Sequence, residues 1–227
     1  MLWTCSSWAE PSPATLRALA LCGLAAPVVF TVAWIAGTLA QDGYSARRED
    51  VSALAAQTAD AAWIVITGLV LTGALTAAFA PALHVAVCGG RGSRIGPVLV
   101  ALAGLGVMGL GLLRNDCSTL TSACKARVET GDVSWQHVAH DALSIPVFAL
   151  AVIAPIVMAP RFRADPKWAS FASWSLVTAA ALTLLFLLAG IEAIPGWGGL
   201  VQRVAVSLAF LWLAAAAVRA CVALAKA

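Results

Sequence analysis

The chain has 227 residues, of which 61% are hydrophobic and 11% are charged, and its formal net charge at pH 7 is +3. Soluble domains carry about 25% charged residues. This composition, with a mean hydropathy of +0.91, therefore excludes an ordinary water-soluble domain. The small positive charge gives no reason to expect a nucleic-acid partner. We expect an integral membrane protein.

Six uncharged or nearly uncharged stretches have about the length that a helix needs to cross roughly 30 Å of hydrocarbon. They are residues 18–40, 61–87, 95–113, 142–159, 169–191 and 197–218. None shows the strict alternation of barrel strands. The sequence therefore predicts an all-α integral membrane protein, a single bundle of six transmembrane helices. The domain covers residues 16–220, between a short N-terminal segment (1–15) and a tail (221–227).

A cleaved signal peptide is the alternative interpretation of the first stretch. Its apolar run is too long for a signal core and lacks a strongly basic lead, so a membrane span is preferred.

Lysine and arginine are unevenly divided between the two sides of the predicted bundle, and they favour the cytoplasmic side. The two ends and the connections after the second and fourth spans carry Arg17, Arg91, Arg94, Arg161, Arg163, Lys167, Arg219 and Lys226. The other connections carry Arg47, Arg48, Lys125 and Arg127. The bias predicts that both termini are cytoplasmic.

Two of the cysteines, Cys117 and Cys124, share the connection after the third span, which is predicted to lie outside. An oxidising exterior favours a disulfide across such a short loop. Two free thiols, or a metal site with the nearby histidines, are the alternatives.

Ionisable residues gather at the outer ends of the predicted spans. In chain order they are Asp60, Arg114, Asp116, His137, His140, Asp141, Glu192 and Arg203. Charges at membrane depth cost about 2.5–3.5 kcal/mol each on insertion scales, so they are seldom placed there without a role. We therefore expect a shared polar pocket open to the outer leaflet.

The spacing of His137, His140, Asp141 and Ser144 places them on one helical face. An imidazole beside a carboxylate suits acid/base chemistry. The candidate catalytic residues are Asp60, Asp116, His137, His140, Asp141 and Glu192.

Two other interpretations of this face stay open. His137 and His140 are one helical turn apart and resemble part of a zinc site that Asp116 or Asp141 would complete, but a fourth clear ligand is missing, so no metal site is assigned. Alternatively the cluster is structural, with Asp141 paired to Arg203 or Arg114.

Four residues are the substrate-binding candidates: Arg114, Ser144, Arg203 and Trp34. Arg203 interrupts the sixth span, where a guanidinium suits a phosphate or carboxylate headgroup. An ion pair between Glu192 and Arg203 is the alternative.

Two further features concern packing. The segment DVSALAAQ, residues 50–57, begins with a helix-capping aspartate and is expected to lie along the membrane surface. Residues 104–109 match a G-x-G-x-x-G pattern, but they lie within a span. We therefore expect these glycines and Gly111 to form helix contacts, either inside one chain or with a second copy or another membrane protein.

Several short motifs occur together: Gly43 and Tyr44 followed by VSALAA, then Asp116 and Cys117, HVAHD at 137–141, and GLVQRV at 199–204. In this order the chain resembles the bacterial six-helix membrane proteins grouped as domain of unknown function 998, over about residues 18–220. The resemblance implies their fold and topology and a multi-pass place in a bacterial plasma membrane.

The sequence supports two functional hypotheses. In the first, an enzyme acts by acid/base chemistry on a membrane lipid or isoprenoid, and in a cyclisation version Asp60, Asp141 or Glu192 is the acid. In the second, the protein is a non-catalytic lipid-binding or accessory subunit with a structural polar cluster. Solute transport ranks last, because broken helices and midplane charges are scarce.

Overall fold

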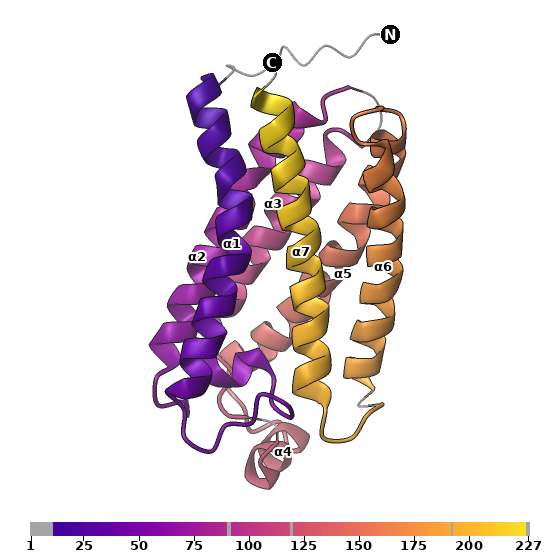
Figure 1. Cartoon of the computed structure of the whole chain (residues 1–227). Coiled ribbons are helices and arrows are strands. Elements are labelled where there is room, and N and C mark those ends of the chain that lie inside the picture. Colours follow the sequence, from indigo (N-terminus) through magenta and orange to yellow (C-terminus); the bar gives the residue numbers. More distant parts are fainter. Residues whose placement is uncertain (1–10, 90–91, 119, 192, 226–227) are drawn as a thin grey trace.

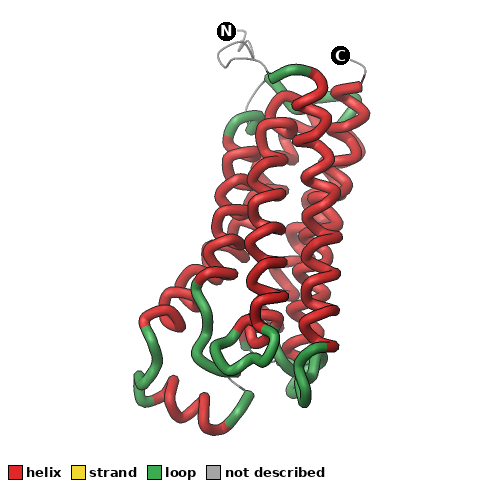
Figure 2. Tube along the Cα trace, turned by 90° about the vertical axis from the view of Figure 1, so that its left-hand side faces the viewer, coloured by secondary structure: helices red, strands yellow, loops and turns green. Residues whose placement is uncertain are grey.

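The computed structural model describes residues 11–89, 92–118, 120–191 and 193–225. Its elements are α1 (Pro13–Leu39), the 3₁₀ helix η1 (Val51–Ala55), α2 (Ala62–Ala86), α3 (Ile95–Leu112), α4 (Ser122–Glu129), α5 (Trp135–Arg163), α6 (Ala169–Gly190) and α7 (Gly198–Ala225). Six of them, all except η1 and α4, are long and apolar enough to cross a membrane. The described ranges contain no strand (Figure 2). The predicted all-α fold with six spans is confirmed.

Several residues named in the sequence analysis lie outside these ranges. They are Glu192, Arg91, Lys226 and residues 1–10 of the N-terminal segment.

The six long helices close into a ring (Figure 1). Contacts join α1 to α2, α2 to α3, α3 to α5, α5 to α6, α6 to α7, and α7 back to α1. Neighbours in the ring are thus neighbours in the sequence, which short connections allow. Helix α1 begins and α7 ends at the same end of the bundle, which we call the terminal end. The opposite end, which carries η1 and α4, is called the loop end (Figures 1 and 2).

Small residues let the helices approach closely. A Cβ added at Gly104 of α3 would lie 2.6 Å from the carbonyl oxygen of Gly73 in α2, and one at Gly68 of α2 would overlap the Cβ of Ala33 in α1. Lipid gives little hydrophobic drive for helix association, so such van der Waals contact provides much of it. The glycines at 104–111 face α2 or α5 of the same chain, so their contacts are internal.

The main apolar core fills the terminal half of the ring. Phe162 stacks on Trp168 with ring centroids 5.0 Å apart, and Phe171 stacks on Trp212 at 6.0 Å. The Trp212 indole N–H donates to Ser175 Oγ at 2.9 Å, so this buried polar atom is paired. Phe79 of α2 reaches Ala217 of α7 beside Gly23 in the same cluster. The ring is therefore closed toward the terminal end.

The connection between α1 and α2 folds back onto the start of α7. The first N–H groups of a helix have no partner within the helix. In α7 the N–H of Gly199 donates to the Arg48 carbonyl at 3.2 Å, and the N–H of Leu200 donates to the Arg47 carbonyl at 3.0 Å. Gly199 is needed here, because a Cβ would overlap the Glu49 backbone. The connection is thereby docked on the bundle.

The expectation that residues 50–57 lie along the membrane surface is wrong. Leu54 and Ala55 are each only 2% exposed, because η1 packs inward against α1, α2 and α3. The Val51 N–H donates to Gln202 Oε1 of α7 at 2.9 Å. The segment is apolar on its inner side and forms a cover at the loop end rather than an interfacial helix.

Three helices extend beyond the uncharged stretches that revealed them, and the first of them, α1, begins at Pro13. Helix α5 begins at Trp135, since Ser134 caps it by accepting from the His137 N–H at 3.3 Å. Helix α7 runs to Ala225, and Leu224 in its last turn packs in the main core. Hydropathy finds only the part of a helix that lies in lipid, so capped polar turns escape it.

Candidate functional site

Asp116 is the most heavily bonded carboxylate at the loop end. It accepts from the Ser134 N–H at 2.7 Å, the Ser134 hydroxyl at 2.5 Å and Gln57 Nε2 at 3.1 Å. Arg127 Nη2 donates to Asp116 Oδ2 at 3.3 Å and forms an ion pair with it. The Ser134 hydrogen bonds hold the pKa of the Asp116 carboxyl below its ordinary value. Asp116 is thus a fixed anion that ties the chain after α3 to the start of α5.

His137 belongs to the same network. Its Nδ1 accepts from the Asp116 N–H at 3.2 Å, and its side chain is 2% exposed. An imidazole that accepts at Nδ1 carries its proton on Nε2. Nε2 lies 3.5 Å from Asp141 Oδ2 but makes no hydrogen bond. His137 is therefore bonded to the backbone of Asp116 and lies beside Asp141.

His140 has the opposite arrangement. Its Nδ1 lies 2.6 Å from the Leu113 carbonyl oxygen, so the proton sits on Nδ1. This leaves the Nε2 lone pair as an acceptor on a side chain that is 4% exposed and lines a cavity inside the helix ring. A backbone carbonyl that fixes the tautomer and orientation of an imidazole is a common device of acid/base sites. His140 is the better placed of the two histidines for chemistry.

Arg203 and Arg114 both bind backbone carbonyls of the α1–α2 connection. Arg203 Nη1 donates to the carbonyls of Ala46, Glu49 and Gly199 at 2.7–2.9 Å, and Nη2 donates to the Tyr44 hydroxyl. Arg114 donates to the carbonyls of Ala55 and Ala56 at 3.0 and 2.8 Å. The two guanidinium groups therefore fasten the two ends of the η1 cover.

Aromatic rings enclose the Arg203 guanidinium. Its Cζ lies 5.2 Å from the Trp34 ring centroid and 5.6 Å from that of Tyr44. Burial raises the pKa of Tyr44 to about 12, so the phenol stays protonated. Trp34 thus packs on the arginine, and it does not line the pocket. The expected pairing of Asp141 with Arg203 or Arg114 is wrong, because both arginines are occupied by carbonyls.

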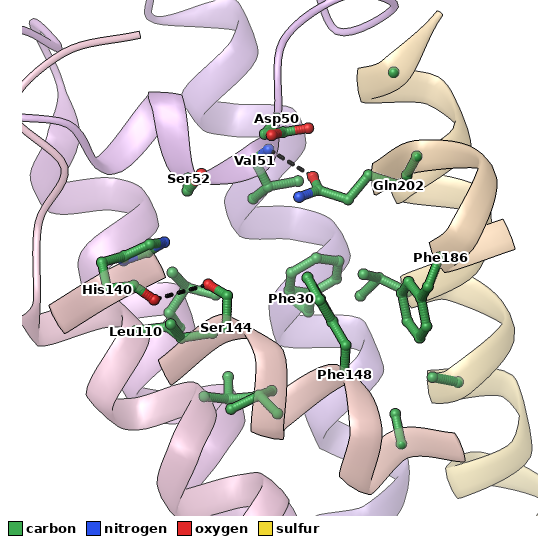
Figure 3. Close-up of a pocket in the computed structure, with 18 of the residues that line it drawn as sticks. Phe30, Asp50, Val51, Ser52, Leu110, His140, Ser144, Phe148, Phe186 and Gln202 are labelled. Atoms are coloured by element: carbon green, nitrogen blue, oxygen red, sulfur yellow. Dashed lines mark hydrogen bonds between the residues drawn. The ribbon is translucent and has the colours of Figure 1, made fainter. Parts of the chain in front are cut away.

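A cavity of about 650 Å³ occupies the ring between the loop end and the core (Figure 3). Its loop-end rim is polar, with Asp50, Ser52, Asn115, His140, Asp141 and Gln202 among its residues. Below the rim the wall is apolar and includes Phe30, Phe148 and Phe186. Its floor is Val100, Ala154, Trp212 and Leu213, which belong to the main core. A polar rim above an apolar shaft matches an amphiphilic molecule.

The cavity is deep. Along α5 it is lined from His140 to Ala154, and fourteen residues at 1.5 Å each span roughly 21 Å. This is about two thirds of the hydrocarbon thickness of a bilayer. The space is suited to an extended chain rather than to a compact solute.

A disulfide joins Cys117 and Cys124, whose Cα atoms are 5.9 Å apart. It fixes α4 to the pocket rim, since Cys117 lines the cavity and Cys124 lies at the start of α4. The neighbouring Ser118 hydroxyl donates to Glu49 Oε2 at 2.6 Å. The α3–α5 and α1–α2 connections are thereby linked to each other over the pocket.

The remaining candidates are dispersed. Asp60 is paired with Gln41, which donates from Nε2 at 3.2 Å and accepts the Asp60 N–H at 2.8 Å, away from the pocket. Ser144 lines the pocket, and its hydroxyl donates to the His140 carbonyl at 2.9 Å. Within the described residues no group of three or more His, Cys, Asp or Glu side chains is arranged to hold a metal ion.

The chain matches the family model described as "Protein of unknown function (DUF998)" over residues 24–219. The chain belongs to this family. The match covers α2, α3, α5 and α6 completely and α1 and α7 in large part, so the pocket is built within the region that defines the DUF998 family. No curated protein and no solved structure matches the chain.

Sequence reasoning did not single out Asp50, Ser52, Asn115 and Gln202 as rim residues, nor the three phenylalanines below them. Asn115 stands directly before Asp116, and Gln202 stands directly before Arg203. The search for ionisable residues selected the charged neighbour in each case and not the amide. Helical spacing offered one signal, because Ser144, Val147, Phe148 and Ala151 continue the face of His140 along α5.

Proposed function

We propose that this DUF998 protein holds a single-chain lipid or isoprenoid in its central pocket, in a bacterial plasma membrane, and that His140 is the acid/base group at the ligand's polar end. The observation that carries the proposal is the cavity itself, which is polar at the rim, apolar below it, and roughly 21 Å long from His140 at the rim to Ala154 at the floor. Its volume of about 650 Å³ lies within the usual range of ligand sites.

The chemistry proposed for His140 rests on its hydrogen bonds. Leu113 holds the Nδ1 proton, and Nε2 is left to accept a proton from the ligand and to return it. Of the acids considered for cyclisation, Asp141 lines the rim and Asp60 does not, so in that version we take Asp141 as the acid. Phe30, Phe148 and Phe186 would then face the chain, where aromatic rings stabilise positive charge.

The first test is a pair of identical substitutions two residues apart on α5. Ala151 lines the pocket, whereas Ala149 is exposed on the outside of the bundle. Ala151→Phe should lower the amount of lipid retained through purification by roughly tenfold, since overfilling a packed site costs about 1–3 kcal/mol. Ala149→Phe should retain the wild-type amount. Native mass spectrometry measures both, and equal lipid in the two variants would reject the pocket as the binding site.

The non-catalytic alternative also has an observation in its favour. Asp116, His137, Arg114 and Arg203 each make hydrogen bonds within the chain. The variant His140→Asn separates the two functions, because its amide N–H reproduces the Nδ1 donor and lacks a titratable nitrogen. If His140 reacts, wild type and variant retain lipids of different mass. The same retained lipid in both would leave a binding protein whose cluster is structural.

A further inference from the structure

We infer that the polar end of the pocket's ligand is a hydrogen-bond donor without negative charge, a hydroxyl or an amine, and that it is not a phosphate. The inference deepens the proposed function and rests on it. It is carried by the acceptors that line the rim, by the sign of the charges there, and by the use of both nearby arginines within the chain.

Three of the residues that line the pocket at its rim offer acceptors. Asn115 is 8% exposed, lines the pocket and has an Oδ1 with no hydrogen-bond partner in the described chain. His140 Nε2 is an acceptor, because the ring proton is held at Nδ1 by Leu113. The Ser144 hydroxyl gives its proton to the His140 carbonyl and keeps its lone pairs. A buried acceptor without a donor costs about 1–3 kcal/mol, which a donor on the ligand would relieve.

The charges at the rim also favour a ligand without negative charge. Among the described lining residues, Glu49, Asp50 and Asp141 are acidic and only Arg48 is basic. Both Glu49 oxygens already accept hydrogen bonds, Oε1 from the Ser45 N–H at 3.0 Å and Oε2 from Ser118 at 2.6 Å. A phosphate would therefore enter a rim of like charge, which costs binding energy.

The arginines expected to bind an anionic headgroup are not free to do so. Arg203 is 4% exposed and gives Nη1 to three carbonyls, and Arg114 gives Nε and Nη2 to two. Neither lines the pocket. Turning either guanidinium toward a ligand would break these hydrogen bonds and release the η1 cover.

The experiment compares three probes with one chain and different polar ends: farnesol, farnesylamine and farnesyl phosphate. Each is added to the full-length protein in phosphatidylcholine nanodiscs, and native mass spectrometry measures the bound fraction. Farnesol or farnesylamine should bind at least about tenfold more tightly than farnesyl phosphate, a difference of about 1.4 kcal/mol. If the amine binds more tightly than the alcohol, the preference over phosphate comes from the carboxylates. If the amine and the alcohol bind equally, the preference comes from the neutral acceptors.

A charge-reversal pair supplies the control. Asp141 of α5 is 59% exposed at the rim, and Asp132, in the connection before α5, is 81% exposed and outside the pocket lining. Asp141→Lys should reduce the difference in binding affinity between farnesyl phosphate and farnesol, whereas Asp132→Lys should leave this difference unchanged.

The outcomes separate the two proposals. Farnesyl phosphate that binds wild type as tightly as farnesol, and is expelled by Ala151→Phe, would overturn the inference and leave the proposed function standing. If the bound fraction of all three probes is the same in wild type and in Ala151→Phe, the proposed function is overturned, and the inference with it.

Discussion

Arg203 illustrates how a membrane-depth charge is accommodated at a single residue. Its planar fork reaches three carbonyl oxygens at once and also stacks near two aromatic rings. Lysine has the same charge but cannot reproduce this geometry. The planar arrangement of the guanidinium N–H donors, and not the charge alone, therefore holds the α1–α2 connection. A substitution by lysine keeps the charge and removes this arrangement, so it tests the geometry.

Arg203→Lys should destabilise the protein by about 1.5–3 kcal/mol, the usual worth of hydrogen bonds to charged groups. Thermal unfolding in detergent measures the loss. Arg219→Lys is the matched control, because Arg219 bonds Lys167 and Ser170 at the exposed terminal end and should change stability by less than about 0.5 kcal/mol. Equal effects of the two substitutions would show that the carbonyl contacts of Arg203 do not hold the cover.

Asp116 gives a prediction for acid stability. Its folded-state pKa lies below the ordinary value of 3.8, so its contribution to the free energy of unfolding is present above pH 3.8 and is lost as the pH falls through the folded-state pKa. Asp116→Asn should be less stable than wild type at neutral pH, and the difference in Tm should shrink from about pH 5 to about pH 3. Asp132→Asn, at an exposed carboxylate, should show no such convergence. A pH-independent difference at position 116 would contradict the assignment.

At this scale the sequence predicts which residues gather at the loop end, but not what each one does. The spacing of His137 and His140 places them on one face, yet one accepts from Asp116 and the other faces the pocket. The difference depends on partners 21 and 27 residues away. Such contacts follow from how two connections fold, and hydropathy and helical period carry no information about that.

Among the elements, the connections determine the loop end. Neither η1, which forms the cover, nor the short helix α4 spans the membrane. Helix α4 has no apolar face, so its sequence does not predict it. Its position depends on the Cys117–Cys124 disulfide and on the Arg127–Asp116 ion pair. The six spans can be predicted from composition, because a helix that crosses lipid must be apolar. The structure of the connections depends on particular contacts, which composition does not predict.

Removing the disulfide tests this dependence. Replacing Cys117 and Cys124 by serine should cost roughly 2–3 kcal/mol for such a short loop. Hydrogen–deuterium exchange should rise in residues 113–134 and leave α1, α2 and α7 largely protected. Cys221→Ser, at a free cysteine near the terminal end, should leave residues 113–134 unchanged. Unaltered exchange in the double variant would mean that other contacts suffice to place α4.

The whole molecule combines a sealed half and an open half. The terminal half is packed with aromatic residues, and the loop half encloses the cavity beneath two linked connections. A ligand can therefore reach the cavity only through the loop end or between helices, and the side of the membrane that the loop end faces decides where the ligand's polar end lies.

The distribution of Lys and Arg predicts that the terminal end is cytoplasmic. Green fluorescent protein fused after residue 227 should then fluoresce, and alkaline phosphatase inserted at Gly131, an exposed turn in the loop end, should be active. Exchanging the two reporters should silence both. The cysteines do not decide the side, because Cys88 at the terminal end is disulfide-bonded as well as Cys117 and Cys124 at the loop end. The orientation therefore rests on the charge bias alone, and the opposite pattern would contradict that bias and place the pocket rim in the cytoplasm.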